Sequence, residues 1–302
     1  MRKTNDPASN PMVALLQGLA TAEGFSPSRL PEVRLMRASR HVPPTPVTYD
    51  PSIVIIAQGR KVGRVGDREF RYDPHNYLVL SIPLPFECET FGRPEEPLYG
   101  VSIRVTAALV GDLLANMNTL PLGAQLRPRA IEAAKLDPAL SASVVRLLEC
   151  LREEDDARIL GQLCVREIAY RVLRGPLGAN LAALAAPHSH VGQLSRILNR
   201  LHAEYHRPFD VESLAREAGL SVSAFHAHFK ALTASSPLQY IKAIRLQRAR
   251  SLIANEGFNA AGAAQRVGYE SASQFSREFK RYFGGTPLQV AGELRRSRVT
   301  LA

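Results

Sequence analysis

The chain has 302 residues, of which 45% are hydrophobic and 22% charged, so it is long enough for two globular domains with ample core. Its composition indicates neither disorder nor a membrane span, because no run approaches the roughly 20 apolar residues that a span requires. The first residues faintly resemble a signal peptide, but polar and proline residues interrupt the apolar stretch, so a short amphipathic helix at 11–22 is expected. Cys88, Cys150 and Cys164 show no C-x-x-C spacing and are expected to be buried packing residues in a reducing cytoplasm.

The net charge of +10 is unevenly distributed along the chain. Residues 188–302 hold 16 Lys and Arg against 8 Asp and Glu, a net charge of +8, whereas residues 1–187 hold 22 against 20. A basic carboxy-terminal part is expected if that part meets nucleic-acid phosphates. Charge alone does not separate this interpretation from a solvated basic face.

Short β-rich runs fill the region from residue 51 to residue 105. They lie at 53–56, 61–65, 69–72, 77–81, 86–90 and 98–105, and glycine and proline turns separate them. A proline-rich run at 43–46 precedes them and is expected to be an extended connector. The close spacing and tight turns favour a small antiparallel β-barrel, cupin-like, or a sandwich, and a barrel of this size can hold one small ligand.

A cupin-type barrel would suggest a metal enzyme if it carried clustered His and Glu ligands. The strand region offers only His75 beside a turn, together with Glu87 and Glu89 and no His-x-His partner. The histidine pairs at 188/190, 202/206 and 226/228 lack a Cys or carboxylate that would complete a zinc site. We therefore predict no metal, no cofactor and no enzymatic activity.

Helical periodicity resumes at 106–117 and continues through 137–153 and 155–173. The last two segments have strongly apolar faces, which either cap the barrel or form a homodimer face, and the sequence does not separate these alternatives. A Gly- and Ala-rich stretch then indicates a domain boundary. The expected architecture is a barrel followed by helices at 1–180, a linker at 181–190 and an all-α domain at 191–302.

The carboxy-terminal domain repeats one motif. Residues 218–230 and 267–280 each run from a glycine turn into a helix with phenylalanines four residues apart, and each copy ends in Pro-Leu-Gln. Gly219 and Gly268 are expected to adopt the left-handed conformation that other residues disfavour. We interpret the copies as two helix-turn-helix units, each of which buries its phenylalanines and turns the opposite helix face outward.

The outward faces of the two second helices carry polar and basic side chains. Those of the first copy are Ser223, His226, Ala227 and Lys230, and those of the second are Ser273, Gln274, Arg277, Lys280 and Arg281. Major-groove readout requires such side chains, because Arg pairs with guanine and Gln with adenine in bidentate fashion. At matched positions within a basic domain they indicate DNA binding rather than an ordinary solvated face. Lys230, Lys280 and Arg281 are the expected phosphate contacts.

A long helix at 237–255 is predicted between the two copies. At about 1.5 Å per residue it spans near 28 Å, which is close to the roughly 34 Å between successive major grooves on one side of B-DNA. Such a helix could hold the second helices of both units, which we call the reading helices, against one duplex, with some DNA bending. Its basic side chains, Lys242, Arg245, Arg248 and Arg250, are expected to point mostly outward.

These residues resemble the arabinose-regulator (AraC/XylS) family of bacterial transcription regulators. The resemblance covers roughly 188–294 and is most specific over 266–269, 275–284 and the Thr286-Pro287 pair. Residues 54–81, with Gln58-Gly59, also resemble the N-terminal domain of one branch of the family. The resemblance implies a barrel that binds a small effector or mediates dimerisation, promoter DNA and RNA polymerase as partners, and usually activation.

The resemblance also implies which residues contact bases. Carried over onto this chain, the base-contacting positions are Ser223, His226, Ala227, Ala272, Ser273, Gln274 and Arg277. Many members have a basic residue where this chain has Ala227, which weakens the contact expected there. The sequence thus predicts a cytoplasmic, sequence-specific regulator with a small-molecule effector. Two alternatives remain, a barrel enzyme with an accessory DNA-binding domain and a DNA-bending architectural protein.

Overall fold

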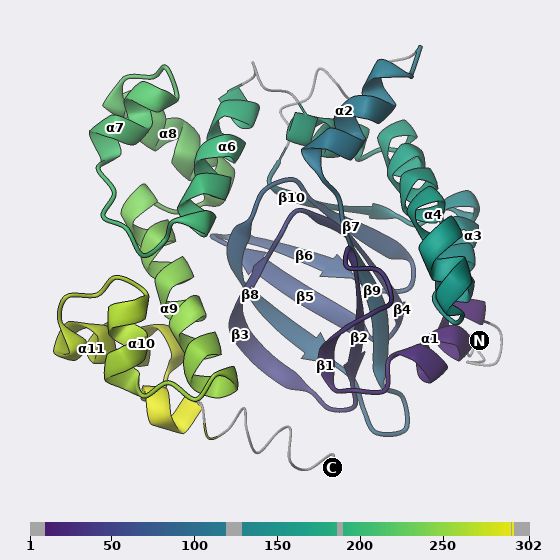
Figure 1. The fold of residues 1–302 in the computed structure, drawn as a ribbon, viewed down its shortest axis with the longest axis horizontal. Helices are drawn as coiled ribbons and strands as arrows, with labels where there is room; N and C mark the ends of the chain where they lie inside the picture. The colour runs from purple at the N-terminus through teal and green to yellow at the C-terminus, as the bar shows by residue number, and fades with distance from the viewer. Residues whose placement is uncertain (1–9, 119–128, 186–189, 291, 293–302) are drawn as a thin grey trace.

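Figure 1 shows the computed structural model, which describes residues 10–118, 129–185, 190–290 and 292. A β-rich part lies at the centre, helices cover one flank of it, and the carboxy-terminal helices lie along the opposite flank. Within the described ranges, no helix combines the length and the apolarity needed to cross a membrane.

The described strands form two antiparallel sheets. One has the order β1-β2-β9-β4-β7-β10 and the other β3-β8-β5-β6, so the sheets stay open at their edges rather than joining into one closed barrel. The strands are β1 (Gly24–Pro27), β2 (Val33–Ala38), β3 (Val42–Tyr49), β4 (Ser52–Gln58), β5 (Arg60–Val65), β6 (Arg68–Tyr72), β7 (Asn76–Leu80), β8 (Leu84–Phe91), β9 (Leu98–Arg104) and β10 (Ile131–Lys135). This confirms the predicted cupin-like antiparallel domain and each of its six predicted strands.

Strand β4 contributes side chains to the cores on both faces of its sheet. All of its residues are buried, because its side chains alternate between the two faces and both faces are covered. Ile53 and Ile55 pack toward the flanking helices, whereas Val54 and Ile56 pack into the space between the sheets. A strand covered on both faces reads as a continuous apolar run, as this one does.

Three strands and one connector differ from the prediction. Strands β1, β2 and β10 were not predicted, and the proline-rich run at 43–46 is not a connector but part of β3, which pairs with β8. The register of that pair shifts between Val42 and Thr45, where prolines remove the backbone N–H groups that a regular ladder needs.

Helices cover the outer face of the six-stranded sheet. They are α1 (Pro11–Leu19), α2 (Ala107–Ala115), α3 (Pro138–Cys150), α4 (Glu154–Arg174), α5 (Gly178–Ala182) and the 3-10 helix η2 (Ala183–Ala185). The predicted apolar face of α3 packs into this core, and so do Val165, Ile168 and Val172 of α4. Ile159 and Leu163, which were predicted on the same face of α4, are instead exposed. All three cysteines are buried, and the Sγ atoms of Cys150 and Cys164 lie 3.7 Å apart, a proximity that the sequence did not indicate.

The carboxy-terminal helices form the two predicted helix-turn-helix units. They are α6 (His190–Ala203), α7 (Val211–Glu217), α8 (Val222–Thr233), α9 (Pro237–Asn255), α10 (Ala260–Arg266) and α11 (Ala272–Phe283). Each of the last five begins at a polar residue whose side chain accepts a hydrogen bond from a backbone N–H of the first turn. At the start of α9, Ser236 and Gln239 form a reciprocal capping box.

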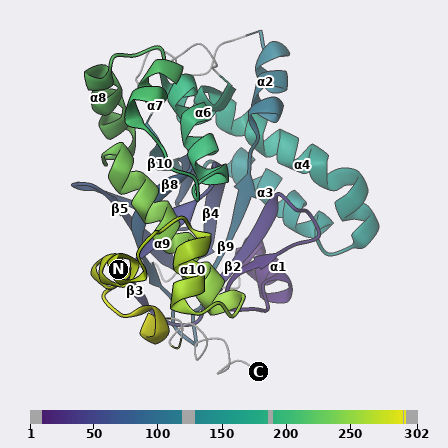
Figure 2. The same cartoon turned by 60° about the vertical axis from the view of Figure 1, so that its left-hand side comes forward.

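Helix α9 also joins this part of the chain to the sheets. Figures 1 and 2 place it alongside the edge formed by β3 and β8. The hydroxyl of Tyr240 donates to the carbonyl of Pro83, and Thr48 donates to Gln247 at 2.7 Å. Ile241 and Ile244 belong to the same buried cluster as the core between the sheets. The two reading helices are therefore held against the β domain by α9.

Candidate nucleic-acid interface

The local geometry of both units follows from their turns and their phenylalanines. Gly219 and Gly268 have φ angles of 63° and 84°, the left-handed conformation predicted for them. Phe225 and Phe229 in α8, like Phe275 and Phe279 in α11, are fully buried. Because these residues recur at four-residue spacing, the opposite face of each helix must point to solvent.

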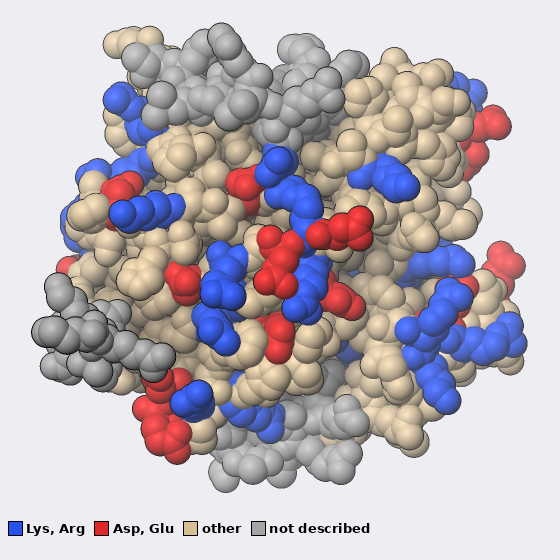
Figure 3. Space-filling model, turned by 180° about the vertical axis from the view of Figure 1, so that it is seen from behind, with Lys and Arg blue, Asp and Glu red and all other residues tan. Residues whose placement is uncertain are grey.

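In the first unit, the predicted contact residues are exposed on α8. Ser223, His226 and Ala227 are exposed, and so is Lys230, the expected phosphate contact. Figure 3 shows the molecule from behind, where the surface over α8 is largely uncharged. Helix α8 thus carries one exposed Lys or Arg side chain, that of Lys230.

In the second unit, the predicted contact residues are also exposed, and more of them are charged. Ala272, Ser273, Gln274 and Arg277 are exposed, as are the expected phosphate contacts Lys280 and Arg281. Figure 3 shows Lys and Arg side chains gathered where α11 lies. At the positions of the first unit that match Gln274, Arg277 and Arg281 after the turn, the chain has Ala224, Ala227 and Ala231.

Glu278 organises the second reading helix, and the sequence did not reveal it. Its carboxylate accepts hydrogen bonds from Lys242 at 2.9 Å, Tyr269 at 2.8 Å and Gln274 at 3.1 Å. Burial alone would raise the pKa of Glu278, but these hydrogen bonds outweigh burial and lower it. The carboxylate thereby ties α11 to α9 and positions the amide of Gln274.

The predicted outward direction of the basic residues on α9 is wrong for several of them. Arg245 is half-buried and donates to three backbone carbonyls. The guanidinium of Arg250 lies 4.7 Å from the ring centroid of Phe283, and Lys242 pairs with Glu278. Arg248 is exposed, with its guanidinium 5.7 Å from the ring centroid of Tyr205. Lys242, Arg245 and Arg250 thus contact the second unit, and Arg245 also contacts the loop before the first unit.

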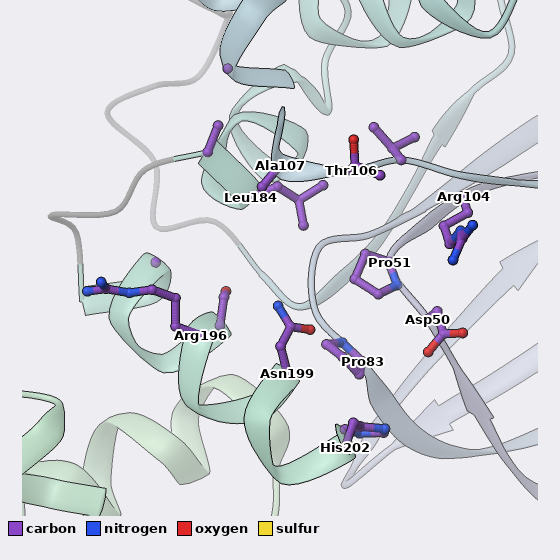
Figure 4. A pocket seen from close by; sticks show the side chains of 15 residues that line it. Asp50, Pro51, Pro83, Arg104, Thr106, Ala107, Leu184, Arg196, Asn199 and His202 are labelled. Atoms are coloured by element: carbon purple, nitrogen blue, oxygen red, sulfur yellow. The ribbon is translucent and has the colours of Figure 1, made fainter. Parts of the chain in front are cut away.

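A cleft of ≈ 570 Å³ lies at the junction of the β domain and α6 (Figure 4). Its lining includes Arg104 from the β domain and Asn199 and His202 from α6, and Arg196 extends toward its far end. His202 contacts the hydroxyl of Tyr240 at 2.9 Å, and burial together with the charge of Arg248 lowers the pKa of His202 to about 3. His202 is therefore neutral, and the cleft mixes charges of both signs without favouring one ligand class.

A second candidate site lies inside the β domain, around Lys61. This lysine is 6% exposed, and its Nζ donates to the hydroxyl of Tyr49 at 2.9 Å. The same Nζ lies 5.4 Å from the ring centroid of Phe25 and 5.7 Å from that of Tyr49. Burial would lower the pKa of Lys61, but its interactions with Tyr49 and Cys88 outweigh burial and raise it. In the described part of the chain, no carboxylate forms an ion pair with this ammonium group.

The aromatic residues around Lys61 form one cluster. Tyr49 makes edge contacts with Phe25 and Phe86, at centroid distances of 5.5 and 5.0 Å. The hydroxyl of Tyr72 lies 3.3 Å from the Sγ atom of Cys88. A buried cation among aromatic rings is costly unless an anion or other partners compensate it. No sequence pattern indicates this site, because Lys61 lies in an ordinary strand and its neighbours come from four other strands.

Comparison with known proteins adds to this geometry. A sequence model described as the AraC-type transcriptional regulator N-terminus matches residues 29–180, and a helix-turn-helix domain model matches residues 214–293. The HTH-type transcriptional regulator AlkR of Acinetobacter baylyi (strain ATCC 33305 / BD413 / ADP1) is 37% identical over 95 residues, which are 32% of this chain and 31% of that protein. The virulence regulon transcriptional activator VirF of Yersinia enterocolitica is 26% identical over 163 residues, 54% of this chain and 60% of that protein. The match thus spans less than two thirds of either relative.

Among solved structures, the unsaturated fatty acid bound wild-type ToxT from Vibrio cholerae strain SCE256 superposes with a TM-score of 0.60 at 12% sequence identity. The superposition covers 86% of this chain and 94% of ToxT. At this identity the likeness shows a shared fold, with the same succession of a β domain and paired helix-turn-helix units.

Proposed function

The chain belongs to the AraC-type family of transcription regulators, and on that premise we propose that it is a sequence-specific DNA-binding regulator acting in the cytoplasm. The observation that carries the proposal is the pair of exposed reading helices, α8 and α11, which Figure 1 shows near opposite ends of α9. Residues 1–180 would form the effector-binding or dimerising domain, 181–190 the linker and 191–302 the DNA-binding domain. The base contacts are the seven predicted positions on α8 and α11, and the phosphate contacts are Lys230, Lys280 and Arg281.

The test is selection of bound DNA from a random-sequence pool by the full-length protein, with genome-wide mapping of its binding sites as the second arm. We expect enriched DNA with two elements about one helical turn apart, bound on the order of a thousandfold or more tighter than random DNA at physiological salt. Equal affinity for enriched and random DNA would overturn the proposal and favour a DNA-bending architectural protein.

We further propose that the regulator activates transcription through contact with RNA polymerase. Support comes from the name of VirF, a transcriptional activator that matches more than half of this chain. A reporter gene behind the enriched DNA should rise when the protein is produced. A fall in the reporter signal would assign repression instead. We propose no enzymatic activity, because the family and these named relatives are regulators.

For the effector we propose a small molecule with an anionic head and an apolar body, held inside the β domain. Lys61 is a buried ammonium without a carboxylate partner in the described residues, and aromatic rings surround it. The fatty acid bound to ToxT, which shares this fold, has the same chemistry. Thermal shifts with fatty acids of increasing chain length, compared with the matching alcohols, should show stabilisation by the acids that Lys61→Met removes. Equal shifts with acids and alcohols would exclude an ionic head group.

We also propose a homodimer that forms through α4. Although its inner face packs into the core, its outer face leaves apolar side chains in solvent, with exposed fractions of 62% for Ile159, 61% for Leu163 and 40% for Tyr170. Their spacing forms a single stripe along the helix. Analytical ultracentrifugation should show a dimer that Leu163→Asp dissociates, whereas Arg158→Asp, a charge change on the same helix, should leave it intact. A monomer at all concentrations would rule out this interface.

A further inference from the structure

Arg245 lies near the middle of α9 and contacts both helix-turn-helix units. Its Nε donates to the carbonyl of Tyr205 at 2.8 Å, and Nη2 donates to the carbonyl of Arg207 at 2.8 Å. Nη1 donates to the carbonyl of Gly268 at 3.0 Å. Tyr205 and Arg207 lie in the loop that leads into α7, whereas Gly268 lies in the turn before α11. One guanidinium group thus bridges the entrance of the first unit and the turn of the second.

The two bridged segments also touch each other directly. A Cβ atom built on Gly268 would lie 2.3 Å from the carbonyl oxygen of His206, so backbone packs against backbone at this point. The matching Gly219 of the first unit has open space around the same position. The contact is therefore specific to the junction between the units and does not belong to the repeated motif.

We propose that Arg245 is a positioning residue that fixes the distance and orientation between the reading helices α8 and α11, and so sets the spacing of the two DNA elements that the chain prefers. This inference rests on the proposed DNA binding. The second unit is attached to α9 by a shared apolar core and by the ion pair between Lys242 and Glu278. The guanidinium group adds a direct tie between the turn at Gly268 and the loop at 205–207, and so fixes the second unit relative to the first.

The chemistry of the bridge requires arginine. A guanidinium presents its N–H donors in a rigid, planar fork, which fits carbonyls in several directions at once. Its partners here are backbone carbonyls, and none of the described carboxylates forms an ion pair with it. Lysine keeps the charge but offers a compact ammonium on a flexible stem, so it cannot hold both segments in one geometry.

The experiment uses the DNA enriched by the full-length wild-type protein, together with versions in which one base pair is inserted or removed between the two elements. The wild type should prefer the original spacing by about tenfold or more. Arg245→Lys should bind the three spacings within about threefold of one another. Arg248→Lys makes the same change one turn further along α9, on an exposed side chain, and should keep the wild-type preference. A parallel loss of affinity at all spacings in Arg245→Lys would overturn the inference and leave Arg245 a purely structural residue.

A second readout works without DNA, and so separates failure of this inference from failure of the proposed function. Spin labels on Ala231→Cys in α8 and Ser276→Cys in α11, both exposed, report the distance between the reading helices. Arg245→Lys should broaden the distance distribution while the melting temperature stays close to that of Arg248→Lys. Arg245→Gln, which keeps a planar head with fewer donors, should broaden it as well. An unchanged, narrow distribution in a folded variant would exclude the positioning role.

Discussion

The two helix-turn-helix units share one scaffold and differ in the surfaces they place on it. Both have a left-handed glycine turn, a polar N-cap and a pair of buried phenylalanines. The second reading helix carries Gln274 and Arg277 where the first carries Ala224 and Ala227, and only the second is anchored through Glu278 to α9. Burial constrains the positions that the two units share, whereas their exposed positions differ. Under the proposed DNA binding, we therefore expect the two units to contribute unequally to recognition.

The largest expected difference between the two units is the loss of stability when their turn glycines are replaced. We expect Gly268→Ala to destabilise the protein by about 3 kcal/mol or more, because the left-handed strain of about 1–2 kcal/mol adds to the collision with His206. Gly219→Ala should cost only about 1 kcal/mol, since its surroundings are open. Urea unfolding of both variants measures the difference. Equal losses would mean that the backbone contact at Gly268 does not constrain the second unit.

The next effect concerns direct readout. Arg277→Ala should lose about 1–3 kcal/mol of binding to the enriched DNA and relax its preference at one base position. His226→Ala in the first unit should lose less, about 1 kcal/mol or below, because α8 offers fewer polar groups around it. Titrations against enriched DNA with single-base changes provide the measurement. If the His226 variant loses more than the Arg277 variant, the first unit is the main reader and the proposed division is reversed.

How much the sequence predicted depends on the range of the interactions. The repeat, the phenylalanine core and the bounds of α9 follow from local periodicity, and the structure confirms them. Strand β10 was missed because its sequence, IEAAK, has weak strand propensity and pairs with β7, some fifty residues away in the chain. Helical periodicity predicts an outward Arg245, because its partners lie 40, 23 and 38 residues away, a range about which periodicity gives no information. The contacts of Lys61 cannot be predicted from local patterns for the same reason.

A smaller effect separates the phosphate contacts from the base contacts. Lys230 and Lys280 occupy matched positions, so Lys230→Ala and Lys280→Ala should each reduce the slope of log affinity against log salt by about one unit. Both should weaken enriched and random DNA about equally, because phosphates carry no sequence information directly. An unchanged slope in one variant would remove that lysine from the interface and make the two units unequal in phosphate contacts as well.

The smallest expected effect lies where the reading helices end. The C-cap residue of α11 is Gly284, with a φ of 78°, and that of α8 is Ala234, with a φ of 57°. This left-handed conformation costs a residue with a Cβ about 1–2 kcal/mol. Ala234→Gly should remove this strain but add chain entropy to the unfolded state, for a net stabilisation of about 0.5 kcal/mol. Gly284→Ala should destabilise the protein by about 1 kcal/mol, because a residue with a Cβ disfavours the left-handed backbone conformation. No collision adds to this cost, since the space around Gly284 is open. The Cβ of Ala234 also lies against Gly66 of the β domain, 3.1 Å from where a Cβ on Gly66 would stand. A loss of stability in Ala234→Gly would therefore mean that this contact between the domains is worth more than the strain of the helix end.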